Sequence, residues 1–185
     1  EESIRRLVAA REHVTTWPDL AFLEGVIHAA MLLPTEWRRY ALENIPMPHP
    51  GVQLLEGAEV EQHRSHASAC FNKAANLLEH IGQGGRRRAQ AAHEWLLWLR
   101  LTDPNPDVME EARQEVRAGM QDGQKAVTLI PFARSFGIAF DEAPLQRYLR
   151  QRVQLGGLDD QELFAELLLA ETRMSRREYM DLLEC

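Results

Sequence analysis

The sequence predicts an all-α protein, a multi-helix bundle of about eight helices joined by short loops. Apolar residues recur at spacings of three and four along most of the chain, which is the period of an amphipathic helix. Proline, glycine or aspartate interrupts this pattern at intervals that suit helix ends and short connections. No stretch has the strict alternation that is typical of a strand.

The expected helices follow one another closely along the chain. Pro18 suits the first turn of a helix that Pro34 closes, and Thr35 can cap the next one. Three prolines within 45–57 mark the clearest loop of the first half. The expected helices span residues 3–14, 20–33, 36–44, 58–81, 86–101, 108–127, 141–154, 161–172 and 176–184, with a short helical piece between Pro131 and Gly137.

Turn and cap residues set the ends of the later helices. The glycine-rich stretch 82–85 is expected to end the helix over 58–81, and the turn at 103–107 ends the next. Asp107 is a suitable N-cap for the helix over 108–127. The last two helices each begin with a capping-box spacing, Asp159 with Glu162 and Ser175 with Glu178.

Length and composition predict a globular protein. The 185 residues fit a single helical domain over 1–185, with a possible division into 1–103 and 107–185. The net charge of −7 disfavours nucleic acid as a general partner, because phosphate binding needs a basic surface. Two cysteines suit a reducing cytoplasm, and an arginine-rich basic set suggests a bacterial source. No apolar run approaches the ~20 residues that span a bilayer, so we expect no membrane partner.

One stripe of the helix over 58–81 carries metal-ligand side chains. Glu59, His63, His66 and Cys70 are spaced by four, three and four, which places them on one helix face. Carboxylate, imidazole and thiolate are the usual zinc ligands. One helix face rarely supplies four ligands to one ion, so a zinc site here needs a donor from elsewhere, such as His28, His93 or a second subunit. The alternative is a polar stripe at the edge of the core.

Three successive arginines follow the glycine-rich stretch. Arg86, Arg87 and Arg88 stand where a helix is expected to start, and free N–H groups there together with guanidinium groups can hold a phosphate or an acidic partner. The Walker ending is missing, which disfavours a nucleotide site. The alternative is a solvated loop.

Two tryptophans make the helix over 86–101 apolar almost all round. Trp95 and Trp98 stand among four leucines. A helix of this kind is either central in the bundle or presents half of its surface to a partner. We therefore name both side chains, together with the three arginines, as candidate partner-binding residues.

The C-terminal pair of helices has the rhythm of a helix-turn-helix. Ser175 can cap the second helix, and Arg176 and Arg177 then stand where a reading helix meets DNA. Acidic residues later in that helix would be repelled by phosphate. A capped helical hairpin that only packs is the alternative.

The stretch 18–37 resembles the YecA-like family of small helical bacterial proteins. An acid-plus-glycine helix over Pro18–Leu33, then Pro34 and the pair Glu36-Trp37, open the domain in that family, and Glu94-Trp95 corresponds to a second tryptophan-containing helix. The resemblance covers about the first half of the chain and implies a helical fold rather than a reaction. The cysteine-rich zinc tail of some members is absent here.

No complete catalytic set is visible, so we expect a protein that is not an enzyme. The first hypothesis is a cytoplasmic protein that binds another protein, as an adaptor, chaperone-like factor or assembly subunit, with a homo-oligomer as one form. A DNA-binding regulator that uses Ser175, Arg176 and Arg177 is the alternative. A metal-binding helical protein is the second alternative.

Overall fold

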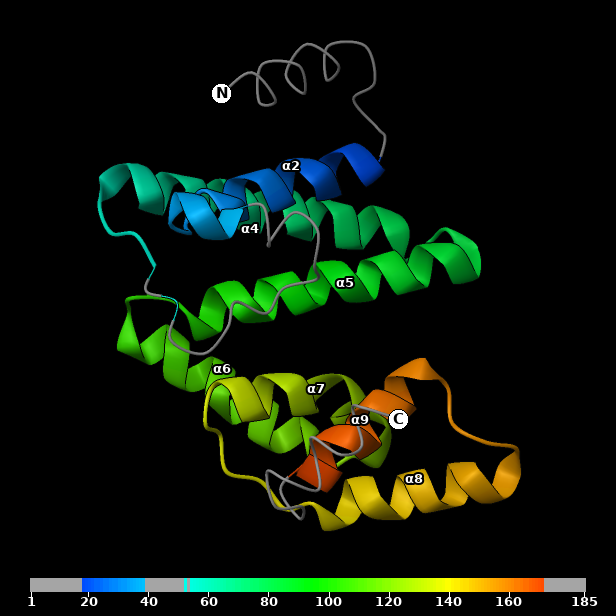
Figure 1. Ribbon diagram of the computed structural model, residues 1–185. Coiled ribbons are helices and arrows are strands. Elements are labelled where there is room, and N and C mark those ends of the chain that lie inside the picture. The colour runs from blue at the N-terminus through cyan, green and yellow to red at the C-terminus, as the bar shows by residue number, and fades with distance from the viewer. Residues whose placement is uncertain (1–17, 39–51, 53, 172–185) are drawn as a thin grey trace. The chain divides into compact units, whose positions relative to one another are not determined.

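The structure is a computed structural model that describes residues 18–38, 52 and 54–171. All regular structure within these ranges is helical, which confirms the predicted fold class (Figure 1). A short helical stretch also covers residues 35–38. The principal helices are α2 (Pro18–Ala30), α4 (Ala58–Leu78), α5 (Gly82–Leu101), α6 (Pro106–Gly119), α7 (Gly123–Ser135), α8 (Ala143–Leu155) and α9 (Asp160–Glu171).

None of the helices in the described ranges has both the length and the apolar character that a membrane span requires.

The chain divides into two compact units, Glu1–Met109 and Glu110–Cys185. The boundary lies within α6, just after the turn at 103–107 where the sequence offers a division. The single domain over 1–185 stays a prediction. All four tryptophans belong to the first unit, so tryptophan fluorescence reports on that unit alone.

In the first unit, α4 packs against both α2 and α5. A row of small residues on α2, Ala21, Gly25 and Ala29, is buried. This row allows a close approach, because a Cβ at Gly25 would lie only 2.8 Å from the Phe71 ring of α4. The Phe71 ring in turn stacks on Trp95 of α5, with 5.5 Å between the ring centroids. Phe71 is therefore the side chain on which all three helices meet.

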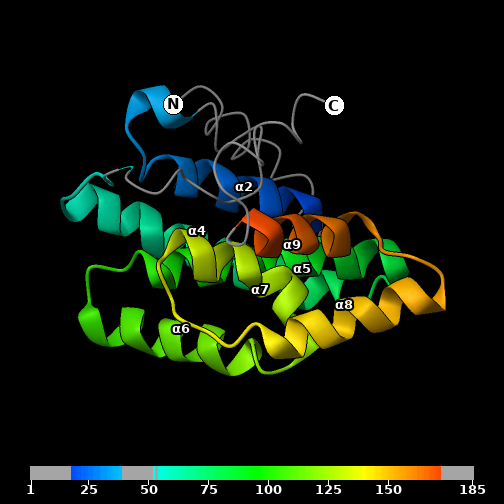
Figure 2. The same cartoon turned by 60° about the horizontal axis from the view of Figure 1, so that its bottom comes forward.

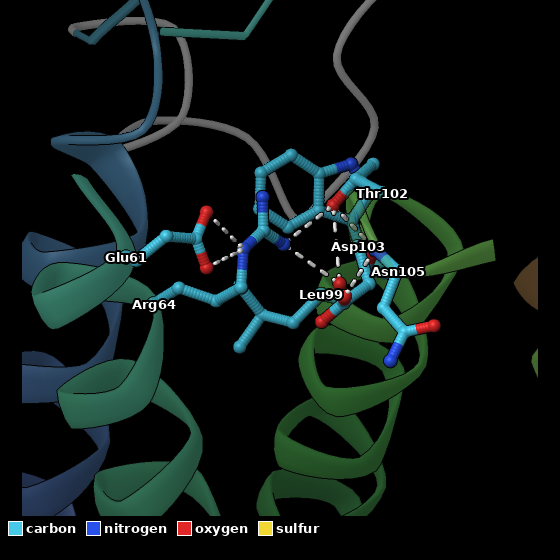
Figure 3. Close-up of polar contacts among 7 residues, drawn as sticks. Glu61, Arg64, Leu99, Thr102, Asp103 and Asn105 are labelled. Carbon is cyan, nitrogen blue, oxygen red and sulfur yellow. Dashed lines mark hydrogen bonds and ion pairs between the residues drawn. The ribbon is translucent and has the colours of Figure 1, made fainter. Parts of the chain in front are cut away.

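A buried arginine joins α4 to the C-terminal end of α5. Arg64 is 6% exposed, and its Nη1 donates to the carbonyl oxygen of Leu99 at 2.8 Å and to Thr102 Oγ1 at 3.2 Å (Figure 3). Its Nε lies 3.4 Å from the carboxylate of Glu61, one turn earlier on α4. The last carbonyls of a helix lack partners within the helix and carry partial negative charge. Arg64 supplies both the donor and the charge that this end of α5 needs.

In the second unit, α7 packs against both α8 and α9 (Figure 2). The N-terminal end of α7 fits closely on α8, because a Cβ at Gly123 would lie 2.5 Å from the Cβ of Tyr148. The core also takes Ala112, Val116 and Met120, all fully buried.

Several predicted helix ends differ from the structure. The helix expected over 58–81 ends at Leu78, and the stretch 82–85 is the first turn of α5 rather than a break. Glycine is tolerated in a first turn, and here it is required, because a Cβ at Gly85 would lie 2.4 Å from the Leu78 carbonyl oxygen. The helix expected over 20–33 runs from Pro18 to Ala30 and continues as a turn.

The single helix expected over 108–127 is two helices. α6 ends at Gly119 and α7 begins at Gly123, because the Asp122 carboxylate accepts the backbone N–H groups of Gln124 and Lys125 and so caps α7. The expected cap at Asp107 is also wrong. Asn105 Oδ1 accepts the Asp107 N–H at 3.0 Å, and α6 already begins at Pro106.

Pro131 does not begin a separate helical piece but lies inside α7. Proline has no N–H, so the Val127 carbonyl receives no backbone donor from residue 131. The helices expected over 141–154 and 161–172 agree with α8 and α9 within two residues. The helices expected over 3–14 and 176–184, most of the one over 36–44 and most of the loop over 45–57 lie outside the described residues.

The capping box at the start of α9 is confirmed. Glu162 donates its N–H to Asp159 Oδ1, and the Asp159 N–H donates to Glu162 Oε2, both at 2.9 Å. Glu162 is 3% exposed and its Oε1 also accepts from Tyr148 Oη at 2.8 Å and Arg152 Nε at 2.6 Å. Burial raises the pKa of Glu162, but the hydrogen bonds from Asp159, Arg152 and Tyr148 outweigh it and leave the pKa below its ordinary value.

We expect the Glu162 carboxylate to make the stability of the second unit sensitive to acid. A lowered pKa in the folded state means that the stabilisation is complete above the ordinary glutamate pKa of about 4.3 and is lost as the pH falls through the lower, folded value. We expect Glu162→Gln to lower the free energy of unfolding by about 1–2 kcal/mol at neutral pH. The loss should shrink in acid, as measured by circular dichroism during urea unfolding.

Glu166→Gln is the matched control for this prediction, because Glu166 lies on the same helix and is exposed. It should leave the free energy of unfolding nearly unchanged at both pH values. An equal effect of the two substitutions at neutral pH would contradict the assigned role of Glu162.

Candidate metal and partner-binding sites

Three histidines from two helices meet in the first unit. His28 lies near the end of α2, and His63 and His66 lie one turn apart on α4. His28 Nδ1 is 2.8 Å from His63 Nδ1, and the two ring centroids are 5.0 Å apart. The His66 ring stacks on His28 with a centroid distance of 5.2 Å. We call His28, His63 and His66 the three-histidine cluster.

The surroundings favour the neutral form of His28. Burial lowers the pKa of His28, and the neighbouring His63 and His66 lower this pKa further, whereas the carboxylate of Glu24 opposes them. A contact between two Nδ1 atoms at 2.8 Å is a hydrogen bond only when one nitrogen carries a proton and the other is bare. The cluster therefore offers at least one unprotonated nitrogen between α2 and α4.

The backbone of α4 orients His66. Its Nδ1 lies 2.8 Å from the carbonyl oxygen of Gln62, which is an acceptor, so Nδ1 carries the proton. Nε2 is then left as the lone-pair donor of this exposed ring. A backbone carbonyl that fixes one ring nitrogen in this way is the usual support of a metal-binding histidine.

Only part of the predicted stripe takes part in the cluster. Glu59, His63, His66 and Cys70 all lie on α4, with Glu59 exposed and Cys70 half-buried. Among the residues that the structure describes, no three histidine, cysteine, aspartate or glutamate side chains are arranged as a ready-made metal site. Of the extra donors that the sequence offers, His28 joins the stripe.

His93 lies apart from the three-histidine cluster. It sits on α5, where its Nε2 is 3.1 Å from a carboxylate oxygen of Glu79, and both side chains are exposed. It is therefore a natural control for any role of the cluster.

The arginine group does not form the expected cradle at a helix start. α5 begins at Gly82, so Arg86, Arg87 and Arg88 lie after its first turn, and the Gly85 N–H already donates to Ile81. All three side chains are exposed. Successive positions on a helix point about 100° apart, so three arginines in a row diverge. Arg88 also pairs with Asp19 of α2 at 2.5 Å.

Trp95 and Trp98 are core residues. Trp95 is 2% exposed and Trp98 is fully buried, with the two rings in an edge-to-face contact at 5.5 Å. Of the two alternatives for this helix, these side chains follow central burial, and a role for Trp95 and Trp98 in partner binding stays a prediction. Their apolar surface is used inside the first unit, against α4.

The large apolar side chains that are exposed among the described residues of the second unit lie on α8, at Val153 and Leu155, and on α9. Leu163, Phe164 and Leu167 are 52%, 49% and 45% exposed. By helix geometry they lie within about 100° of arc, opposite the buried side that carries Ala165 and Leu169. We call Leu163, Phe164 and Leu167 the α9 apolar face. The sequence does not reveal this face, because a helix with apolar residues on two sides has the same sequence pattern as a helix that is buried on all sides.

A polar hollow of about 400 Å³ lies where the start of α7 meets α8. Its lining includes Asp122, Gln124, Arg147 and Tyr148. Asp122 already accepts the first free N–H groups of α7, so the helix start has little left to offer an anion. The hollow contains no set of residues with an evident catalytic arrangement.

The candidate DNA-reading residues Ser175, Arg176 and Arg177 lie outside the described residues, and their role stays a prediction. Searches among models of protein families, curated proteins and solved structures find no match to this chain. The resemblance to the YecA-like family also stays a prediction.

Proposed function

We propose that this protein works by binding another protein, and that the α9 apolar face is its docking surface. The observation that carries the proposal is the half-exposure of three large apolar side chains on one side of a single helix. Contiguous apolar surface of this kind is typical of interaction sites on globular proteins. The proposed role is that of an adaptor or assembly subunit rather than an enzyme.

The composition of the α9 apolar face supports a protein partner. An aromatic side chain beside leucines gives a partner a large contact area, and Phe164 shares its face of α9 with Leu163 and Leu167. The acidic Glu166 is exposed on the same helix and would belong to a polar rim. This arrangement suits an apolar groove or helix face on the partner, whether a different protein or a second copy of this chain.

Replacing the face with polar residues tests the proposal. We expect the triple substitution Leu163→Gln, Phe164→Gln and Leu167→Gln to abolish a stoichiometric complex that the unaltered protein forms, because the buried contact is lost. Glutamine keeps a good helix propensity, so α9 itself should persist. The measurement is native mass spectrometry of protein purified gently from its source, with circular dichroism to verify the helix content.

The first unit offers a matched control for this experiment. Leu23 and Ile81 are 52% and 51% exposed, and Leu23→Gln with Ile81→Gln removes apolar surface of the same kind outside α9. This variant should keep the complex. A complex that survives the triple substitution, or a strictly monomeric and partner-free protein, would overturn the proposal.

A further inference from the structure

We propose that the three-histidine cluster binds a divalent transition-metal ion, with zinc the best fit, between α2 and α4. The cluster supplies imidazole donors from two helices. An ion between them is therefore bound from more than one direction, which ligands on a single helix face cannot achieve. Imidazole is a favoured ligand of zinc and of other late first-row metals. Nothing in the proposed binding of a protein partner depends on this site.

The contact between His28 and His63 marks the position of the ion. Their Nδ1 atoms face each other at 2.8 Å and share one proton. Two nitrogens on one tetrahedral zinc, each bound at 2.0–2.1 Å, lie about 3.3 Å apart. The two rings therefore need to separate by only about 0.5 Å for the ion to replace the shared proton.

His66 supplies the third donor. Its ring centroid is 5.2 Å from that of His28, and the carbonyl of Gln62 holds the proton on Nδ1, which leaves Nε2 to bind. In the structure the ring stacks on His28 instead of aiming Nε2 at the point between the other two rings. Binding therefore requires rotation of His66, which also rearranges its contact with the Gln62 carbonyl; the exposed side chain leaves room for this movement.

The electrostatic setting suits a cation. Two of the three imidazoles, those of His28 and His63, lie at half-buried positions. Glu24, one turn before His28 on α2, places an opposite charge beside the cluster. A metal ion held by neutral imidazoles satisfies these lone pairs without adding a charge on each ring. The fourth position of the ion is open to water.

Zinc titration of the full chain tests the proposal. We expect one equivalent of zinc by native mass spectrometry and isothermal calorimetry. His28→Asn and His66→Asn should each lower the zinc affinity by at least about tenfold, because loss of a ligand costs at least as much as loss of its support. His93→Asn and Cys70→Ser should leave the affinity unchanged, the first as an exposed imidazole on α5 and the second as a member of the α4 stripe alone.

A cobalt spectrum of the unaltered protein provides a readout that needs no variant to fold. Intense visible bands of a tetrahedral ion without a thiolate charge-transfer band are expected. Absence of zinc uptake, a zinc affinity unaffected by His28→Asn, or a thiolate band that Cys70→Ser removes would each overturn the proposal. The last result would instead place the ion on the stripe of Glu59, His63, His66 and Cys70.

Discussion

Phe71→Ala is expected to cost the first unit about 3–5 kcal/mol of its free energy of unfolding. The ring is fully buried and touches aromatic partners on two other helices, Phe22 at 5.7 Å and Trp95 at 5.5 Å between centroids. Truncation removes both contacts and leaves a cavity at the meeting point of α2, α4 and α5. Urea unfolding followed by tryptophan fluorescence measures this loss, because all four tryptophans lie in the first unit.

Gly25 turns this prediction into a double-substitution test. A Cβ at Gly25 would lie 2.8–3.0 Å from three atoms of the Phe71 ring, so Gly25→Ala alone should destabilise the unit. In a Phe71→Leu background the ring is gone and the new methyl group has room. We expect the double variant to be more stable than the sum of the two single effects predicts. Simple additivity would show that the ring does not limit the approach of α2 to α4.

Arg64→Met is expected to lower the free energy of unfolding of the first unit by about 2–3 kcal/mol. Methionine keeps the aliphatic packing but loses the charged donors to the Leu99 carbonyl and Thr102 Oγ1. Methionine also removes the free-energy cost of burying the guanidinium charge. The expected loss of stability is therefore smaller than the sum of the contributions of the separate hydrogen bonds. Urea unfolding followed by tryptophan fluorescence again gives the measurement.

Two controls separate this role from an ordinary ion pair. Arg88→Met breaks the exposed pair with Asp19 and should cost less than about 1 kcal/mol. Added salt should weaken that exposed pair and change the Arg64 contribution little, because its main acceptors are a carbonyl and a hydroxyl in a buried place. Equal costs for the two substitutions, or a strong salt dependence at Arg64, would contradict the interpretation.

The helical periodicity and the local caps of the sequence were sufficient to predict the fold class and much of the helix order. The Asp159 and Glu162 capping box could be predicted because both of its hydrogen bonds are local. The break at Asp122 was missed although the sequence carries a signal for it: residues 121–125 contain no apolar side chain, and Asp122-Gly123 is a typical turn pair. The stretch 82–85 was predicted to end a helix because glycine is common at helix ends, whereas Gly85 is required by its close approach to the Leu78 carbonyl, which the sequence does not reveal.

The candidate sites divide in the same way. Helical spacing placed His63 and His66 on one side of α4, but only the packing of α2 on α4 brings His28 to them. The sequence gives no means to choose among His28, His93 and a second subunit as the extra donor. Similarly, composition cannot separate a buried apolar helix such as α5 from one with an exposed side such as α9. That distinction depends on which neighbour covers the helix.

The row of Ala21, Gly25 and Ala29 has a consequence for how this chain can diverge. Alanine and glycine are the smallest residues, so nearly every substitution in the row adds volume. The contact between α2 and α4 is too close to accept that volume. A relative with a larger residue at Gly25 is expected to carry a smaller one in place of Phe71. In distant relatives positions 25 and 71 should therefore change together, while exposed sites such as Arg87 change independently.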